Sequence, residues 1–249
     1  MFKRFPTKRA LAAAFKIRGR RLESRWPFLP RASGRELNLH FDDLLELQFA
    51  RSRDFMVVVV GAYDGLQNDP VSRFIRTHDC RGILIEPQPT IYERLRENYR
   101  DFPRLTLLNV AIDETSGSRL FHSVKAGSDL PEWTEQIASF SLDHVKKHES
   151  DAPGLAAHIV SQPIRTISFH DLFAQFDVTS IDVLQIDAEG MDAQLLRWFP
   201  FDRVRPGVVH YEIVHMPAGD EGEIRERLER FGYRVFEADS PTDAMAVIV

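Results

Sequence analysis

The feature that most constrains the fold is a continuous apolar run that ends in a glycine-flanked turn. Residues 55–60 read Phe-Met-Val-Val-Val-Val, the composition of a central strand that is covered on both faces of a parallel sheet. Gly61-Ala-Tyr-Asp-Gly65 follows at once, and the next apolar run ends in Glu86. This order predicts a buried strand, a tight turn and a neighbouring strand whose ends lie close together.

After residue 55, apolar runs alternate with segments of helical period, the pattern of βαβ units. This alternation predicts an α/β fold with a mostly parallel sheet, and because the last two runs are joined by a short turn, we expect an antiparallel closing pair at one edge. Strands are expected at 55–60, 82–86, 105–112, 118–123, 163–167, 181–186, 208–213, 234–238 and 244–249, and helices at 42–49, 71–78, 90–99, 168–176, 192–199 and 220–231.

Charge divides the chain of 249 residues into two parts. Residues 1–35 form a basic arm with eleven Lys or Arg and one acid, so 36–249 carry a net charge of −15 within a total of −5. The arm can dock on anionic lipid, on nucleic acid or on its own body, and its Arg-rich, acid-poor start also imitates a transit peptide. We expect 36–249 to form a single domain.

The single cysteine and the lack of long apolar runs bear on location. Cys80 cannot form an intrachain disulfide, which is typical of a reducing compartment. No run approaches the length of a membrane span or a secretory signal. We therefore expect a cytoplasmic protein, with peripheral membrane contact through the arm as an option.

Residues 125–160 differ from the rest, because they mix Gly and Pro with three histidines and have no long apolar stretch. This composition indicates an inserted region of loops and short helices, which often covers an active site. His144 and His148 are four residues apart on an expected helix. Without a third ligand nearby, they indicate a polar face rather than a zinc site.

The Gly61–Gly65 turn and Glu86 together indicate a nucleotide-like ligand. In an open parallel sheet, ligands bind beyond the carboxyl ends of the strands. A carboxylate at Glu86 can accept two ribose hydroxyls and repels a ribose phosphate. The alternative is that the glycines only close a strand–helix turn and that Glu86 is a solvated strand end.

The turn also argues against a dinucleotide. The fingerprint G-x-G-x-x-G holds a pyrophosphate against bare backbone, whereas Tyr63 occupies the second glycine position here. The acidic residue Asp64 disfavours a pyrophosphate but suits a ligand that carries an ammonium and a sulfonium. S-adenosylmethionine carries both.

These motifs resemble the FkbM family of methyltransferases over about residues 55–213. The resemblance implies a Rossmann-like class I methyltransferase fold, a three-layer sandwich with a mostly parallel seven-stranded sheet and an antiparallel closing strand. It rests on Val60-Gly-Ala-Tyr-Asp-Gly65 with Asn68-Asp69-Pro70, Ile85-Glu-Pro-Gln-Pro89, Asn109-Val-Ala111, Ser139-Phe-Ser141, Ile186-Asp-Ala-Glu-Gly190 and Glu212.

The same resemblance implies roles for individual residues. The turn residues would line the methionine part of S-adenosylmethionine, Glu86 would hold the ribose, Ala111 would border the adenine and Asp187 would face the sulfonium. Val60 departs from the acidic or amide residue of many family members, so one polar contact to the amino acid end is missing or replaced. The turn residues implied are Gly61, Ala62, Asp64 and Gly65.

Methyl transfer is an in-line displacement in which positioning supplies much of the acceleration, and an oxygen nucleophile also benefits from a base or a metal. The candidate catalytic residues are Asp187, Glu189, Glu212 and His215. Alternatively, Glu189 caps the following helix and His215 is a solvated loop residue. Four converging side chains could ligate a hard cation, but their spacing matches no metal motif, so no metal is assigned.

The sequence thus predicts an S-adenosylmethionine-dependent methyltransferase. We expect O-methylation of a sugar, a glycan or another polar small-molecule hydroxyl. A nicotinamide-dependent oxidoreductase on a related sheet and a non-catalytic binding protein that acts through its arm remain alternatives. Nucleic acid is disfavoured as a partner, because the positive charge is confined to the arm. The oligomeric state stays open.

Overall fold

The computed structural model describes residues 40–248 except 68 and 239, so the basic arm at 1–35 lies outside the described residues. Seven strands form the main sheet in the order β10-β11-β9-β8-β1-β2-β3, and within this sheet β11 alone runs antiparallel to its neighbours. The strands are β1 (Met56–Val60), β2 (Arg81–Ile85), β3 (Leu105–Leu108), β8 (Val183–Ile186), β9 (Val208–Glu212), β10 (Tyr233–Glu237) and β11 (Asp243–Ile248).

This strand order confirms the expected Rossmann-like class I methyltransferase fold. The expected antiparallel closing pair is confirmed, because β10 and β11 pair antiparallel at one edge of the sheet. Within this pair the last strand, β11, lies inside between β9 and β10, so that β10 forms the edge. A short hairpin turn allows either position, so the sequence pattern alone could not choose between them.

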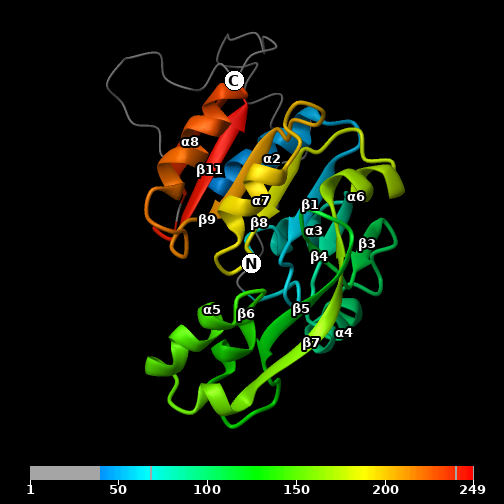
Figure 1. Cartoon of the computed structure of the whole chain (residues 1–249). Helices are drawn as coiled ribbons and strands as arrows, with labels where there is room; N and C mark the ends of the chain where they lie inside the picture. The colour runs from blue at the N-terminus through cyan, green and yellow to red at the C-terminus, as the bar shows by residue number, and fades with distance from the viewer. Residues whose placement is uncertain (1–39, 68, 239, 249) are drawn as a thin grey trace, which may run out of the picture.

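Helices cover both faces of the sheet, as Figure 1 shows. Alternate residues of β1 supply the two cores: Val58 and Val60 pack among residues of α6, α7 and α8, and Val57 and Val59 among residues of α2, α3 and α4. None of the helices in the described part of the chain is long and apolar enough to cross a membrane. The six helices are α2 (Phe41–Arg51), α3 (Ser72–Thr77), α4 (Pro89–Asn98), α6 (Phe169–Gln175), α7 (Asp192–Trp198) and α8 (Asp220–Arg230).

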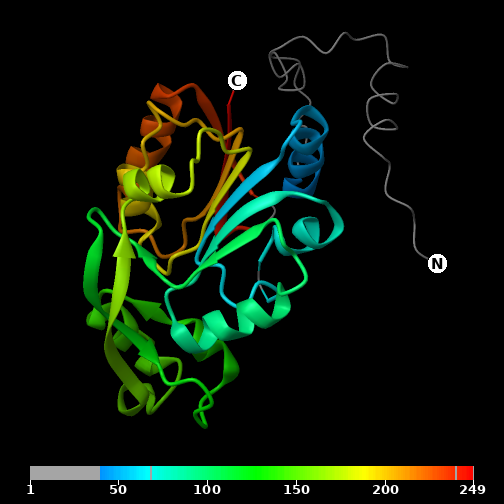
Figure 2. The same ribbon diagram turned by 90° about the vertical axis from the view of Figure 1, so that its right-hand side faces the viewer.

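The chain also builds a second, four-stranded sheet in the order β4-β7-β5-β6. Its main feature is a long antiparallel ribbon of β5 and β7, which reaches away from the main sheet (Figure 2). The single strand expected at 105–112 is two strands, because the chain leaves the main sheet after Leu108 and Ala111 pairs with β7. The four strands are β4 (Ala111–Ile112), β5 (Gly117–Val124), β6 (Ala138–Ser139) and β7 (Ile159–Ile167).

Asn109 fixes the point where the chain leaves the main sheet. Its side-chain amide donates to the carbonyl oxygens of Glu86 (2.9 Å) and Pro87 (3.1 Å). The end of β2 and the start of the second sheet are therefore tied together. This tie brings both sheets to the same edge, where the candidate site lies.

Between β5 and β7, residues 125–158 form short helices around a small core of their own, which we call the insertion. Val145 and Leu155 are fully buried in this core, which is separate from the two large cores. The insertion contains η1 (Glu132–Gln136), β6, α5 (Leu142–Lys146), η2 (Lys147–Ser150) and η3 (Leu155–His158).

The turn after β1 depends on Gly65. Its φ is +72°, and a Cβ added there would lie 2.2 Å from Cε2 of Tyr99. Tyr99 is buried and its hydroxyl donates to the carbonyl oxygen of Gly65 at 2.8 Å. The ring therefore cannot move aside without losing a hydrogen bond.

We expect Gly65→Ala to lower the free energy of unfolding by about 2–5 kcal/mol, because it adds left-handed backbone strain and an overpacked contact. Gly127 is a matched control, since its φ is +70° and a Cβ there would meet no atom within 4 Å. Gly127→Ala should lower the free energy by only about 1 kcal/mol. Urea unfolding monitored by circular dichroism measures both; equal losses would show that the Tyr99 contact does not matter.

Candidate active site

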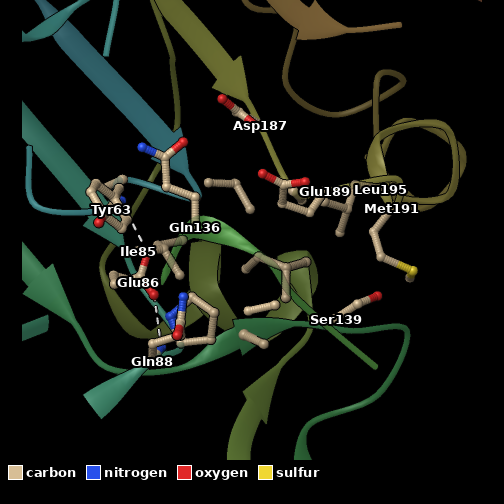
Figure 3. A pocket seen from close by; sticks show the side chains of 18 of the residues that line it. Tyr63, Ile85, Glu86, Gln88, Gln136, Ser139, Asp187, Glu189, Met191 and Leu195 are labelled. Atoms are coloured by element: carbon tan, nitrogen blue, oxygen red, sulfur yellow. Dashed lines mark hydrogen bonds between the residues drawn. The ribbon is translucent and has the colours of Figure 1, made fainter. Parts of the chain in front are cut away.

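A cleft lies where β1, β2 and β8 end, and the second sheet and the insertion form its other walls. It encloses about 870 Å³, including space that is open to solvent. Figure 3 shows Glu86, Tyr63 and Gln88 on one side, Glu189, Met191 and Leu195 on the other, and Asp187 between them. The remaining walls include Gly61, Ala62, Gln67, Asp69, Ala111, Phe121, Gln136, Ala138, Ser139, Phe140 and Gln185.

The ends of β1 and β8 approach so closely at Gly61 that no side chain fits there. Its φ is +83°, and a Cβ would lie 1.7 Å from the carbonyl oxygen of Asp187. The amide of Asp187 donates to the carbonyl of Val60 (2.9 Å), and the amides of Gly61 and Ala62 both donate to the carbonyl of Ile85 (3.0 and 2.9 Å). Three strand ends are thus joined in one backbone network that forms the floor of the cleft.

Glu86 is held rigidly at this floor. Only 4% of it is exposed, and its two carboxylate oxygens accept from the amides of Tyr63 (3.0 Å) and Gln88 (2.7 Å). A carboxylate oxygen can accept two hydrogen bonds, so each oxygen keeps one position for a ligand. Through these two positions the side chain can accept two neighbouring hydroxyls from the cleft. Burial raises the pKa of Glu86 to about 7.

The expected cofactor residues divide into two groups. Gly61, Ala62, Ala111 and Asp187 line the cleft with Glu86. Asp64 lies in the turn behind it, where its carboxylate accepts from the amides of Leu66 and Gln67, both at 2.9 Å. Gly65 packs against Tyr99. These two residues shape the turn and do not line the cleft, whereas their neighbours Tyr63 and Gln67 do.

Asp69 is a cleft residue to which the sequence analysis gave no role. One of its oxygens accepts from the amide of Val71 (2.9 Å), and the other is buried and has no hydrogen-bond partner among the described residues. Burial raises the pKa of Asp69 to about 7. Val60 and Asp69 both line the cleft. Asp69 therefore provides an acidic group near the position at which this chain has Val60 in place of the acidic or amide residue of many family members. The Asn68-Asp69-Pro70 motif was visible in the sequence, but only the fold shows where it lies.

Asp187 and Glu189 both reach the cleft, because the backbone between them reverses direction. Glu189 has a φ of +49° and Gly190 a φ of +87°, so two successive residues are left-handed. Glu189 does not cap α7, since Met191 is the N-cap residue and no side chain caps this helix. Asp192 instead accepts from the amides of Ala188 (3.3 Å) and Glu212 (3.4 Å), which ties the turn to the end of β9. Burial, followed by the charge of Asp187, raises the pKa of Glu189 to about 7, near the ideal for a base at neutral pH.

The other two candidate catalytic residues lie behind this turn and do not line the cleft. Oε2 of Glu212 is buried without a partner among the described residues, and burial with the nearby carboxylates raises its pKa to about 9. His215 lies with its Nε2 atom 3.7 Å from Oε2 of Glu189. The described residues contain no group of three or more His, Cys, Asp or Glu arranged to hold a metal ion.

The insertion is fastened to the cofactor side of the cleft through Glu135. Its carboxylate accepts from Arg94 of α4 (2.6 Å) and from the amide of Gly127 (2.7 Å), and its carbonyl accepts from the side chain of Gln88 (3.1 Å). Burial alone would raise the pKa of Glu135, but these hydrogen bonds hold it below its usual value. Gln136 and the residues up to Phe140 follow directly and form one wall of the cleft.

Comparison with known proteins now gives the family. The family model described as the methyltransferase FkbM domain matches residues 60–235, most of the chain. The chain belongs to the FkbM methyltransferase family. This family uses S-adenosylmethionine as its methyl donor.

Individual relatives are more distant. The chain is 26% identical over 146 residues to the 2-O-methyltransferase NoeI of Sinorhizobium fredii (strain NBRC 101917 / NGR234), a match that covers 57% of this chain and 56% of that protein. It thus spans little more than half of that relative's length. Solved structures with a similar fold include two methyltransferases.

The first is a methyltransferase FkbM from Methylobacillus flagellatus KT (12% identity, 78% of this chain and 43% of that one, TM-score 0.45). The second is a precorrin-6y C5,15-methyltransferase from Geobacter metallireducens GS-15 (14% identity, 82% and 86%, TM-score 0.40). The assignment to the FkbM family rests on the domain match.

The cleft of this FkbM methyltransferase fits its cofactor. Glu86 offers two acceptor positions, which suit a ribose diol, and Asp69 and Asp187 offer acidic groups, which suit a cationic ligand. At the second glycine position of a dinucleotide fingerprint, Tyr63 is held in a left-handed conformation with φ +47°. A nicotinamide dinucleotide therefore lacks the bare backbone that its pyrophosphate requires.

The buried carboxyl groups make stability depend on pH. The pKa values of Glu86, Glu189 and Glu212 are raised in the folded state, as are those of Asp187 and Asp192. Between their unfolded and folded pKa values the folded state binds more protons, so stability must fall as pH rises through this range.

We expect the urea midpoint to fall steadily from pH 6.5 to pH 9, the range in which these carboxyl groups lose their protons in the folded state but are already ionised in the unfolded state. Glu212→Gln should flatten the upper part of this decline, because the pKa of Glu212 is raised to about 9. Glu93→Gln, at an exposed position on α4, is the control and should leave the slope unchanged. A midpoint that rises with pH would contradict this account.

Proposed function

We propose that this protein transfers the methyl group of S-adenosylmethionine to a hydroxyl of a sugar or another polar small molecule. The observation that carries this proposal is a pair of carboxylates on opposite sides of one cleft, Glu86 buried and Glu189 half-buried. Glu86 is placed to hold a ribose, and Glu189 to take a proton from an acceptor. The similarity to a 2-O-methyltransferase supports an oxygen acceptor.

Cofactor binding in this proposal uses residues at the ends of β1, β2 and β8. Glu86 would accept the two ribose hydroxyls, Asp69 the ammonium of the amino acid end, and Ala111 would border the adenine. Bound there, S-adenosylmethionine supplies a methyl group on a sulfonium whose leaving group is a neutral thioether. The Gly61 backbone gives the close approach that this end of the ligand requires.

Glu189 is the base in this proposal. Its carboxylate lies on the far side of the cleft from Glu86, and it accepts the acceptor's proton while the electron pair of that O–H bond stays on the oxygen that forms the new bond to the methyl carbon. Its pKa of about 7 means that it is largely ionised above neutral pH. Asp187 beside it favours the protonated form of Glu189 after the transfer.

The acceptor side of the cleft combines polar and aromatic groups. Gln136 and Ser139 of the insertion provide donors and acceptors that match hydroxyls, and Phe121 and Phe140 provide flat apolar surfaces for the C–H face of a sugar ring. Few polar groups on an otherwise apolar wall are typical of a specific small-molecule site. This mixture favours a carbohydrate over a charged acceptor.

Two variants separate the proposed cofactor contacts. Glu86→Ala should weaken both S-adenosylhomocysteine and 5′-methylthioadenosine at least about tenfold, because both carry the ribose diol. Asp69→Asn should weaken S-adenosylhomocysteine about tenfold and leave methylthioadenosine unchanged, since the latter lacks the ammonium. Isothermal calorimetry measures these affinities, with the exposed Glu93→Ala as control. Equal losses for both ligands in Asp69→Asn would assign Asp69 to the turn and not to the ligand.

Activity can be tested with the full chain, methyl-labelled S-adenosylmethionine and a panel of mono- and oligosaccharides, with products located by mass spectrometry. We expect Glu189→Gln to lower kcat about 10²–10⁴-fold while the affinity for S-adenosylhomocysteine stays the same. The wild-type kcat should fall as pH drops below about 7. Glu132→Gln, on the exposed side of η1, is the control. Stabilisation by NAD(P) and not by S-adenosylhomocysteine in a thermal shift would reject the proposal.

A further inference from the structure

Three histidines from distant parts of the chain meet behind the Asp187–Gly190 turn. His144 of α5 and His148 of η2 belong to the insertion, and His215 follows β9. Their ring centroids are 5.7, 5.7 and 6.0 Å apart, and each pair of rings meets edge to face. We call these three residues the histidine cluster. The cluster joins the insertion to the Asp187–Gly190 turn and to the loop after β9.

The cluster touches the residues that carry the proposed base. A Cβ added to Gly190 would lie 2.9 Å from Cε1 of His144, so the ring of His144 rests on the glycine that follows Glu189. Nε2 of His215 lies 3.7 Å from Oε2 of Glu189. The histidine cluster therefore supports a turn in which Glu189, a non-glycine residue, holds an unfavourable left-handed backbone conformation.

Electrostatics favour the uncharged form of all three rings. Burial lowers the pKa of His144 to about 4, with further lowering from Lys147 and the other two rings, and burial also lowers the pKa values of His148 and His215. The opposite charges nearby are Glu189 and Asp151, the latter 3.9 Å from Nδ1 of His148. Neither outweighs burial. The cluster is neutral at pH 7.

We propose that the histidine cluster is an uncharged clasp that closes the insertion onto the main sheet and thereby positions Glu189 for the acceptor. This inference rests on the proposed role of Glu189. The three histidines are positioning residues, since none of them lines the cleft. Glu135 holds the insertion on the cofactor side of the cleft, and the clasp holds it on the acceptor side. The wall formed by Gln136, Ser139 and Phe140 lies between these two contacts.

In this clasp the flat ring of His144 acts by filling the space against Gly190. His144→Ala removes the support under Gly190, whereas His144→Phe keeps a flat ring that cannot become charged. For the full-length enzyme at pH 8 we expect His144→Ala to lower kcat at least about tenfold, because a small displacement of a catalytic group has a large effect on rate. The affinity for S-adenosylhomocysteine should change by less than about twofold. His144→Phe should restore most of kcat.

Hydrogen exchange gives a readout that needs no acceptor. A histidine whose pKa is lowered on folding contributes stability that is present above its unfolded pKa and is lost as pH falls towards its folded value. As the pH is lowered from 6.5 to 4, backbone amide hydrogen exchange at residues 141–151, corrected for intrinsic rates, should become faster in the wild type. The same change in pH should have a much smaller effect in His144→Phe. His158→Ala is the matched control, because His158 lies in the insertion beside Asp129, with 3.3 Å between Nε2 and Oδ1.

The outcomes separate the clasp from the proposed function. If no sugar is methylated but exchange behaves as expected, the clasp stands and the acceptor assignment fails. If methyl transfer occurs and His144→Ala retains the wild-type kcat, the clasp is wrong. Loss of S-adenosylhomocysteine binding in His144→Ala, or equal exchange in wild type and His144→Phe, would also overturn it. Stoichiometric Zn²⁺ binding that His144→Phe abolishes would replace the uncharged clasp with a metal site.

Discussion

The close approach of the β1 and β8 ends is the constraint on which the rest of the site depends. Only hydrogen occupies the space between Gly61 and the carbonyl of Asp187, so the two strand ends can share backbone hydrogen bonds with the end of β2. This network brings Glu86, Asp69 and Asp187 into one cleft. Any side chain at Gly61 would force the two strands apart and separate these acids.

The cleft brings several carboxyl groups together where water is partly excluded, and ionising them there lowers the stability of the folded state. Six carboxyl groups in or behind the cleft have raised pKa values: Asp69, Glu86, Asp187, Glu189, Asp192 and Glu212. Raised pKa values of this kind are common at functional sites, because the groups are placed for a ligand and not for folding. A cationic ligand would relieve the repulsion, which favours binding of a sulfonium.

The insertion connects the two halves of the proposed reaction. Its Glu135 is bonded to Arg94 beside the cofactor side, and its histidines lie behind the turn that carries Glu189. The residues between these anchors form the acceptor wall. A small core of its own, around Val145 and Leu155, lets the insertion keep its shape while it spans the cleft.

The sequence by itself determined the main sheet and its strand ends. The apolar runs are long and uniform, and Gly61 and Glu86 stand at their ends, so local pattern is enough to place them. The position of Asp69 in the cleft, the position of β11 between β9 and β10, and the second sheet were not predicted, because each depends on pairing between distant segments. The histidine cluster was decided by tertiary structure alone. His144 and His148 lack a third partner in the sequence, and only the packing of the insertion against the loop after β9 brings His215 and Glu189 to them.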